Sequence, residues 1–208
     1  FLSISFAENH YLYFDGDADY VDLSSSINSF ALGQGDFSIK TKAKFLNGDD
    51  RNQIFSYGVN SNSQGFYIQY QNYAIRADIS HIAGGTTEAL LENEWYEVTF
   101  VHSSGNFKIY IDGALSADYD LSPNISTGAA YIGNSVDGQN WWFNGYIDYF
   151  GYYSTALTGD SITGEPSESD ASLVSYYDFN SGSGNILHDQ SGNDNYGTIH
   201  GATWILEN

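Results

Sequence analysis

Hydrophobic and polar residues alternate along much of this chain, as in strands that have one face in a core and the other in water. Residues 36–45 give the clearest example. The residues expected to face the core are Phe37, Ile39, Thr41, Ala43 and Phe45. The residues expected to face solvent are Ser38, Lys40, Lys42 and Lys44. Lysines on the outer side of a strand typically discourage pairing with the edge of another sheet.

Similar short runs continue along the chain, separated by Gly, Asn, Asp and Ser, which favour turns. The predicted strands are 53–57, 65–70, 73–79, 95–102, 107–111, 129–132, 143–153, 173–179 and 196–204. Asp112-Gly113 directly follows one of these runs and predicts a hairpin turn with a positive φ at the glycine. Residues 161–171 are polar and acidic, which predicts a surface excursion before the last strands. The pattern indicates an all-β protein, an antiparallel β-sandwich.

Length and composition set the number of domains. The chain has 208 residues, of which 41% are hydrophobic, enough for one large core. Because β-sandwiches of about 200 residues are commonly single domains, we expect one domain over residues 1–208 with its core between about residues 11 and 204. Cysteine is absent, which excludes disulfides, a thiolate nucleophile and a cysteine metal site.

Charge narrows the choice of partners. The chain has 26 acidic and 6 basic residues, for a formal net charge of -20. This charge repels phosphate groups and argues against nucleic acid or an anionic membrane surface, whereas it favours cations. No apolar run approaches the roughly 18 residues of a membrane span, so we expect no membrane insertion. Surplus acid with abundant Gly, Asn and Ser is typical of secreted or cell-surface bacterial proteins, which is the localisation we expect.

The segment 133–145 contains two adjacent tryptophans, Trp141 and Trp142, among small polar residues. Sugars have apolar faces and polar rims, so indoles surrounded by amides and carboxylates suit a saccharide ligand. The alternative is that at least one indole packs in the core and anchors the strand that follows. Placed in a sandwich, Phe143 and one indole are expected in the core, which leaves the other, Trp141, at the rim.

Several short motifs occur in an order that is typical of one family. They are Phe14-Asp-Gly-Asp-Ala-Asp-Tyr-Val21, Asp36-Phe-Ser-Ile39, Trp95-Tyr-Glu-Val98, Tyr110-Ile-Asp-Gly113, Tyr131-Ile-Gly133, Phe143-Asn-Gly-Tyr-Ile-Asp148, Leu173-Val-Ser-Tyr-Tyr-Asp-Phe179, Asp189-Gln-Ser-Gly-Asn193 and Gly201-Ala-Thr-Trp204. In this order the chain resembles a laminin-G-like domain of the concanavalin A-like lectin/glucanase superfamily from Tyr11 to Trp204. One departure is Glu97, where the family often has histidine.

The resemblance implies a jelly roll of two antiparallel sheets, one of them curved into a shallow concave surface. It also implies termini that lie close together and ligand-bearing loops at one rim. The superfamily hosts lectins, carbohydrate-binding modules, glycosidases, lyases and protein-binding adhesion domains, so function must be argued from sites. Within it, a lectin module of a bacterial repeat-containing (RTX-type) adhesin fits the composition best.

Calcium is the expected cofactor, and the first candidate site is the turn Asp15-Gly-Asp-Ala-Asp19. Calcium takes six to eight oxygen ligands, many of them carboxylate oxygens. An EF-hand loop is excluded because Tyr20 stands where that loop needs glycine. The resemblance places this turn near the last strands, where Asp17, Asp19 and Asp148 would share one ion. The alternative is that these aspartates cap turns.

A second candidate calcium site lies in the loop of the two tryptophans. Its ligands for calcium or sugar would be Asn134, Asp137 and Asn140, with Asp49 and Asp50 from a neighbouring loop. An ion held there would bind vicinal sugar hydroxyls while an indole packs on the ring. The segment 189–195 is also rich in oxygen ligands, and either a structural turn or a metal site would explain it.

Catalysis is not expected. Glycosidases of this superfamily place acidic residues at alternate positions on one strand, as Glu-x-Asp-x-Glu, and no such motif occurs here. The five histidines are scattered and stand in no HExxH or triad context. We therefore expect a protein that is not an enzyme.

Three hypotheses follow. The first is a calcium-dependent lectin module of a bacterial adhesin. It would bind cell-surface glycans, including fucosylated ones, through the loop of the two tryptophans. The second is a carbohydrate-binding module of a polysaccharide-degrading enzyme, which binds extended chains along the concave sheet. The tyrosines expected on that sheet are Tyr57, Tyr67, Tyr70 and Tyr73. The third is a protein-binding or spacer domain. In each case we expect a monomeric module within a larger chain.

Overall fold

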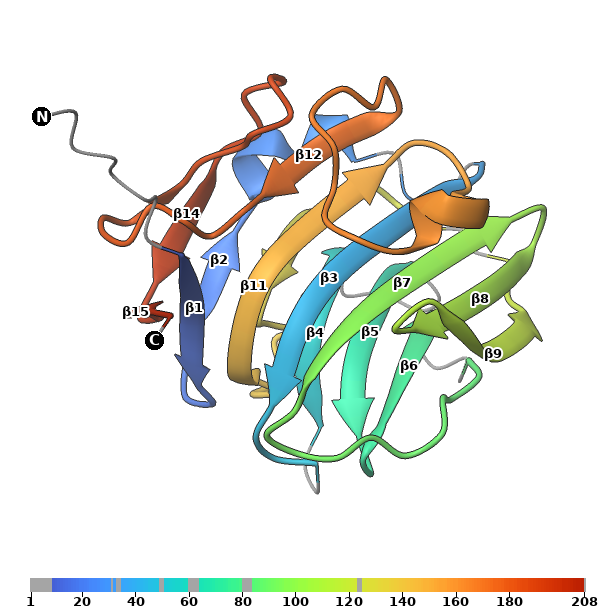
Figure 1. Cartoon of the computed structure of the whole chain (residues 1–208), viewed down its shortest axis with the longest axis horizontal. Coiled ribbons are helices and arrows are strands. Elements are labelled where there is room, and N and C mark those ends of the chain that lie inside the picture. The colour runs from blue at the N-terminus through green and yellow to red at the C-terminus, as the bar shows by residue number, and fades with distance from the viewer. Residues whose placement is uncertain are drawn as a thin grey trace, which may run out of the picture.

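Two antiparallel sheets pack face to face in the computed structural model (Figure 1). The structure describes residues 9–207 apart from 31, 33–34, 49–50, 60–63, 80–83 and 123–124, and it leaves out the side chains of 27–29. The eight-stranded sheet has the order β15 (Thr203–Leu206), β1 (His10–Asp15), β11 (Asn144–Tyr153), β3 (Phe37–Phe45), β7 (Trp95–Ser103), β8 (Asn106–Ile111) and β9 (Ala114–Asp120), and β12 (Leu173–Tyr177) also pairs with β11. The predicted all-β antiparallel sandwich is confirmed.

The second sheet has seven strands and carries one side of the candidate site. Its order is β13 (Ile186–Leu187), β14 (Gly197–His200), β2 (Tyr20–Asp22), β10 (Ala129–Ile132), β4 (Asn52–Gly58), β5 (Gly65–Gln71) and β6 (Ala74–Ile79). Two short 3-10 helices complete the described elements, η1 (Ser24–Ser29) and η2 (Gly159–Ile162). None of the helices in the described part of the chain is long and apolar enough to cross a membrane.

The strand predictions hold with one clear exception, the run 196–204. Gly201 has a φ of 75°, a left-handed conformation that breaks the run after β14. β14 therefore belongs to the seven-stranded sheet, while β15 crosses to the other sheet and pairs with β1. This pairing places the described ends of the chain side by side, as the resemblance implied. The hairpin at Asp112-Gly113 is confirmed, with φ of 48° and 78° joining β8 to β9.

Aromatic side chains fill the space between the sheets. Phe45 of β3 stacks on Tyr70 of β5 with ring centroids 4.4 Å apart, and Phe55 of β4 lies 5.1 Å from Phe150 of β11. Each such ring contributes a large apolar area to the core. The expectation that Tyr57, Tyr67 and Tyr70 line a concave binding surface is wrong, because all three are buried. Only Tyr73 of that set is exposed, by 38%.

The outer face of the eight-stranded sheet is partly covered by residues 154–172, which connect β11 to β12. These residues help bury a second apolar cluster, formed by Val101, Tyr149, Tyr153, Leu157, Ile162, Leu173 and Tyr176. Figure 1 shows η2 lying over this sheet. Residues 161–171, which the sequence indicated as a surface excursion, therefore belong to a segment that covers one end of the sheet.

This cover corrects the prediction that Ser38 and Lys40 face water. Both are buried, and the Lys40 ammonium donates to the carbonyl oxygens of Ser161 at 3.1 Å and Thr163 at 2.9 Å. Burial lowers the pKa of Lys40, although the nearby Glu97 carboxylate opposes this effect. The suggested edge role of the lysines is also wrong, because β3 lies between β11 and β7 in the interior of its sheet.

Replacing Lys40 tests this cover. We expect Lys40→Met to lower the free energy of unfolding by about 1–3 kcal/mol, because the carbonyl groups of Ser161 and Thr163 lose their donor. The matched control is Lys42→Met at the next outward position, where the lysine is half-exposed and pairs with Asp148 at 2.6 Å. Loss of such a pair costs less than about 1 kcal/mol. Urea denaturation measures both variants, and equal losses would contradict the buried role of Lys40.

Candidate functional site

The loop of residues 133–143 joins β10 to β11 and is fixed at both ends. Phe143 is fully buried, with its ring 5.5 Å from Phe14 and 6.0 Å from Phe45. Gly133 donates to Ile54 O at 3.0 Å and accepts from Phe143 N at the same distance. A Cβ on Gly133 would lie 2.8 Å from the Phe14 ring, so this position requires glycine. The expectation that Phe143 belongs to the core is confirmed.

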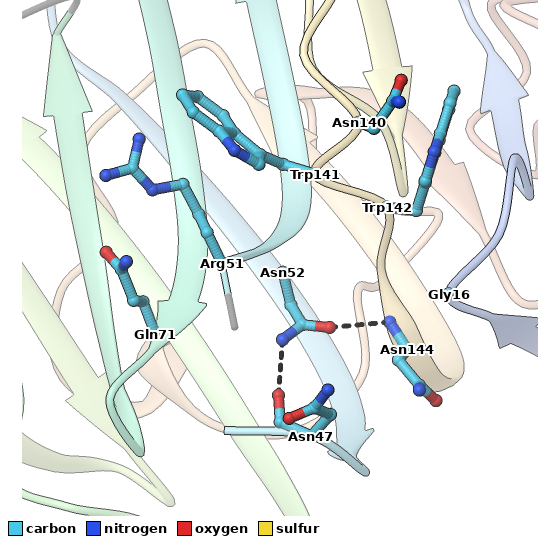
Figure 2. A pocket seen from close by; sticks show the side chains of 9 residues that line it. All are labelled: Gly16, Asn47, Arg51, Asn52, Gln71, Asn140, Trp141, Trp142 and Asn144. Carbon is cyan, nitrogen blue, oxygen red and sulfur yellow. Dashed lines mark hydrogen bonds between the residues drawn. The ribbon is translucent and has the colours of Figure 1, made fainter. Parts of the chain in front are cut away.

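Next to this anchor, the loop forms one wall of a pocket of about 480 Å³ (Figure 2). The pocket is lined by Trp141, Trp142, Arg51, Gly16 and the amide side chains of Asn47, Asn52, Gln71, Asn140 and Asn144. Both indoles are half-buried, and neither belongs to the two apolar clusters. One indole was expected in the core, and the structure instead places both at the pocket.

Trp141 is held from two sides. Its carbonyl oxygen accepts a hydrogen bond of 3.1 Å from Gln53 N, which attaches the loop to β4. The guanidinium group of Arg51 lies over the indole, 4.1 Å from the ring centroid. This is a cation–π contact, and Figure 2 shows the two side chains side by side.

Trp142 is supported by a stack of rings that crosses three strands. It stacks on Tyr20 at 6.1 Å, and Tyr20 in turn stacks on His200 at 4.5 Å and meets Tyr131 edge-on at 5.6 Å. Burial raises the pKa of the Tyr20 phenol, and the nearby Asp22 and Tyr131 act in the same direction. The Tyr20 phenol in this stack is therefore neutral at neutral pH.

Asn52 positions the polar side of the pocket. Its side chain is only 2% exposed. Asn52 Oδ1 accepts from Asn144 N at 3.0 Å, and Asn52 Nδ2 donates to Asn47 O (Figure 2). These bonds connect the start of β4 to the start of β11 and to the loop after β3. The amides of all three segments therefore face one pocket, and amides can both donate to and accept from hydroxyl groups.

Of the sugar ligands predicted in the loop, only Asn140 and the two indoles line the pocket. Asn134 Oδ1 accepts from Ser135 N at 2.7 Å. Asp137 Oδ1 accepts from Ser135 Oγ at 2.6 Å and from Gln139 N at 3.0 Å. Both side chains therefore shape the turn. The predicted ligands Asp49 and Asp50 lie outside the described residues.

The structure does not bring Asp148 together with Asp17 and Asp19. Asp15 pairs with Asn144, whereas Asp148 follows Ile147 at the other end of β1, about 13 Å away at 3.3 Å per residue. Asp148 is instead paired with Lys42. At the turn, Asp15 Oδ1 accepts from Asp17 N at 2.8 Å and Asp19 Oδ2 accepts from Asp15 N at 3.0 Å. The turn-capping alternative fits these contacts.

The acidic side chains that the structure describes are dispersed. In that part of the chain, no three His, Asp or Glu side chains gather around one point. Asp189, in the segment 189–195, accepts hydrogen bonds from Tyr176 N, Ser191 N, Ser191 Oγ and Asn195 N at 2.8–3.0 Å. These bonds confirm the structural-turn interpretation of the segment. Calcium binding therefore stays a prediction.

Sequence reasoning missed Arg51, Asn52 and Gln71 as pocket residues. Arg51 and Asn52 stand beside Asp49-Asp50, and the acids of that run drew the prediction. Gln71 ends a strand whose tyrosines, Tyr67 and Tyr70, drew the prediction instead. Only the pairing of β4 with β5 and the Trp141 bond to Gln53 bring them to the tryptophan loop. The only indication in the sequence was Arg51 itself, one of two arginines in the chain, next to an asparagine at the start of a strand.

The fold is shared with solved structures of low sequence identity. A candidate carbohydrate-binding protein of Bacteroides ovatus ATCC 8483 matches with a TM-score of 0.74 at 17% identity, over 97% of this chain and 60% of that protein. The CBM40 domain of Ruminococcus gnavus IT-sialidase, bound to α2,6-sialyllactose, matches with a TM-score of 0.61 at 14% identity, over 76% of this chain and 98% of that one.

A native heptameric SAP-like pentraxin from Limulus polyphemus matches with a TM-score of 0.58 at 12% identity, over 80% of this chain and 86% of that one. Among curated protein sequences, none matches this chain. The family model for the concanavalin A-like lectin/glucanases superfamily matches residues 15–163, well over half of the sequence. The chain belongs to the concanavalin A-like lectin/glucanase superfamily.

Proposed function

We propose that this domain is a non-catalytic carbohydrate-binding module, a lectin, that holds a saccharide in the pocket beside Trp141 and Trp142. The observation that carries the proposal is the pocket itself, in which two half-buried indoles face five amide side chains. An indole packs on the apolar face of a sugar ring, while amides bond its hydroxyl groups. The volume of about 480 Å³ suits a small ligand or the end of a glycan.

Similar proteins support this proposal. The matched family model is named for lectins and glucanases. Two structural neighbours are a candidate carbohydrate-binding protein and a sialidase domain bound to sialyllactose. The present chain spans 60% of the length of the Bacteroides ovatus protein.

The types of residue in the pocket favour binding over hydrolysis. Most glycoside hydrolases need two carboxyl groups flanking the scissile bond. The described lining supplies one guanidinium group and five amides, along with the two indoles and a glycine. These groups can orient a sugar but none of them is suited to protonate a leaving group or attack an anomeric carbon at neutral pH.

We further propose that the module works outside a bacterial cell, within an adhesin or a similar surface protein. The support is compositional: a formal net charge of -20 together with abundant Gly, Asn and Ser. Which cell-surface glycan the module binds, fucosylated or otherwise, depends on the guanidinium and amide groups that line the pocket.

Removing either indole tests the pocket. We expect Trp141→Ala and Trp142→Ala each to weaken binding of the best glycan ligand by about tenfold or more, because buried tryptophans are common hot spots. The matched control is Trp95→Ala, since Trp95 is also half-buried beneath a cation, with Lys44 Nζ 5.1 Å from its ring, but lies on the outer face of the eight-stranded sheet. Glycan arrays find the ligand, and calorimetry measures its affinity. Loss of binding in Trp95→Ala alone would move the site to that outer face.

The role of calcium is tested separately. Because the indoles, amides and guanidinium group of the described lining are themselves able to hold a sugar, we expect EDTA to leave glycan affinity within about twofold. Calorimetric titrations with EDTA and with added calcium chloride make the comparison. If EDTA abolishes binding, the sugar is held through an ion, and ligands outside the described residues, such as Asp49 and Asp50, must take part.

A further inference from the structure

We infer that the pocket selects a sugar that carries a single carboxylate, and that Arg51 binds this carboxylate. The inference rests on the proposed lectin function and names its class of ligand. It starts from the placement of one cation in a strongly acidic chain. The chain has only 6 basic residues against 26 acidic ones, so a positively charged group in a pocket needs an explanation.

Most of the basic side chains already have oxygen partners. Lys40 donates to two backbone carbonyls, Lys42 pairs with Asp148 at 2.6 Å, Arg76 pairs with Asp78 at 2.9 Å, and Lys108 lies 3.9 Å from Asp118. Arg51 differs, because its contact within the described residues is the face of Trp141. Lys44 likewise lies over rings, those of Trp95 and Tyr146, but it stands outside the pocket.

The contact with Trp141 prepares Arg51 for an anion. A cation–π contact uses the face of the guanidinium group and leaves its in-plane N–H groups for hydrogen bonds. A carboxylate accepts two parallel bonds from that edge, and such charge-assisted pairs are roughly twice as strong as neutral hydrogen bonds. The indole fixes the plane of the guanidinium group, so less conformational entropy is lost on binding. The amides of Gln71 and Asn140 remain for hydroxyl groups of the same sugar.

The net charge of the whole chain limits the ligand to one acidic group. A formal charge of -20 repels a polyanion whose charges extend beyond the pocket. At physiological ionic strength the Debye length is about 8 Å, so a single carboxylate bonded to Arg51 interacts more strongly with that cation than with acids beyond this distance. The pocket therefore favours the acidic end of a glycan over an acidic polymer.

Paired ligands that differ only in acidity test the inference. The probes are sialyllactose against lactose, and cellobiouronic acid against cellobiose, with alginate as the polyanion. We expect at least one acidic probe to bind at least about tenfold more tightly than its neutral partner. Arg51→Gln should remove that advantage, so that the acidic probe and its neutral partner bind this variant with affinities within about twofold of each other. Arg51→Lys should restore only part of it, because an ammonium group lacks the planar fork.

Lys44→Gln is the matched control, since it removes one positive charge from a cation that also lies over a tryptophan. It should leave acidic and neutral binding unchanged. An equal loss in Lys44→Gln and Arg51→Gln would overturn the inference in favour of a general charge effect, and tighter binding of alginate than of the monoacidic probes would overturn the limit to one carboxylate. Tight binding of neutral glycans that depends on Trp141 but not on Arg51 would overturn the inference and leave the lectin function standing. Binding of no glycan at all would overturn both.

Discussion

The site depends on the burial of Phe143 in the aromatic core between the sheets. Its ring packs edge-on against Phe14 at 73° and against Phe45 at 90°, at the point where β11 begins. Because the side chain of Phe143 enters the core, the two residues immediately before it belong to the loop and lie at the rim of the sandwich. An apolar anchor of this kind fixes both indoles without burying either of them.

The pocket draws on both sheets, which makes it a property of the whole sandwich. Asn52 and Arg51 stand at the start of β4 in the seven-stranded sheet, whereas Asn144 begins β11 in the eight-stranded one. The stack of Trp142, Tyr20 and His200 ties the loop to β2 and β14. A rigid scaffold that carries a ligand-binding loop is the usual arrangement for recognition. Substitutions far from the pocket act on it only through these shared supports.

Local patterns predicted the fold well, and tertiary contacts decided the rest. The alternation at residues 36–45 gave the core face of β3, but it could not show that a later segment covers the opposite face and buries Lys40. The motif order identified the family, and the tryptophan pair marked a loop that lines a pocket. The aspartates could not be assigned from sequence alone, because Asx turns and calcium loops use the same residues. Arg51 could not be identified as a pocket residue from its own neighbours, because its ring partner Trp141 stands ninety residues further along the chain.

The central claim is that a saccharide binds between these indoles, and indole N–H resonances test it most directly. The chain has 4 tryptophans, so each resonance can be assigned by substitution and followed during a titration with sialyllactose. Trp204 donates its indole N–H to Gly184 O, and Trp95 lies on the outer face of its sheet. The account predicts that the signals of Trp141 and Trp142 shift saturably while those of Trp95 and Trp204 stay in place. Saturable shifts confined to Trp95 or Trp204 would contradict it.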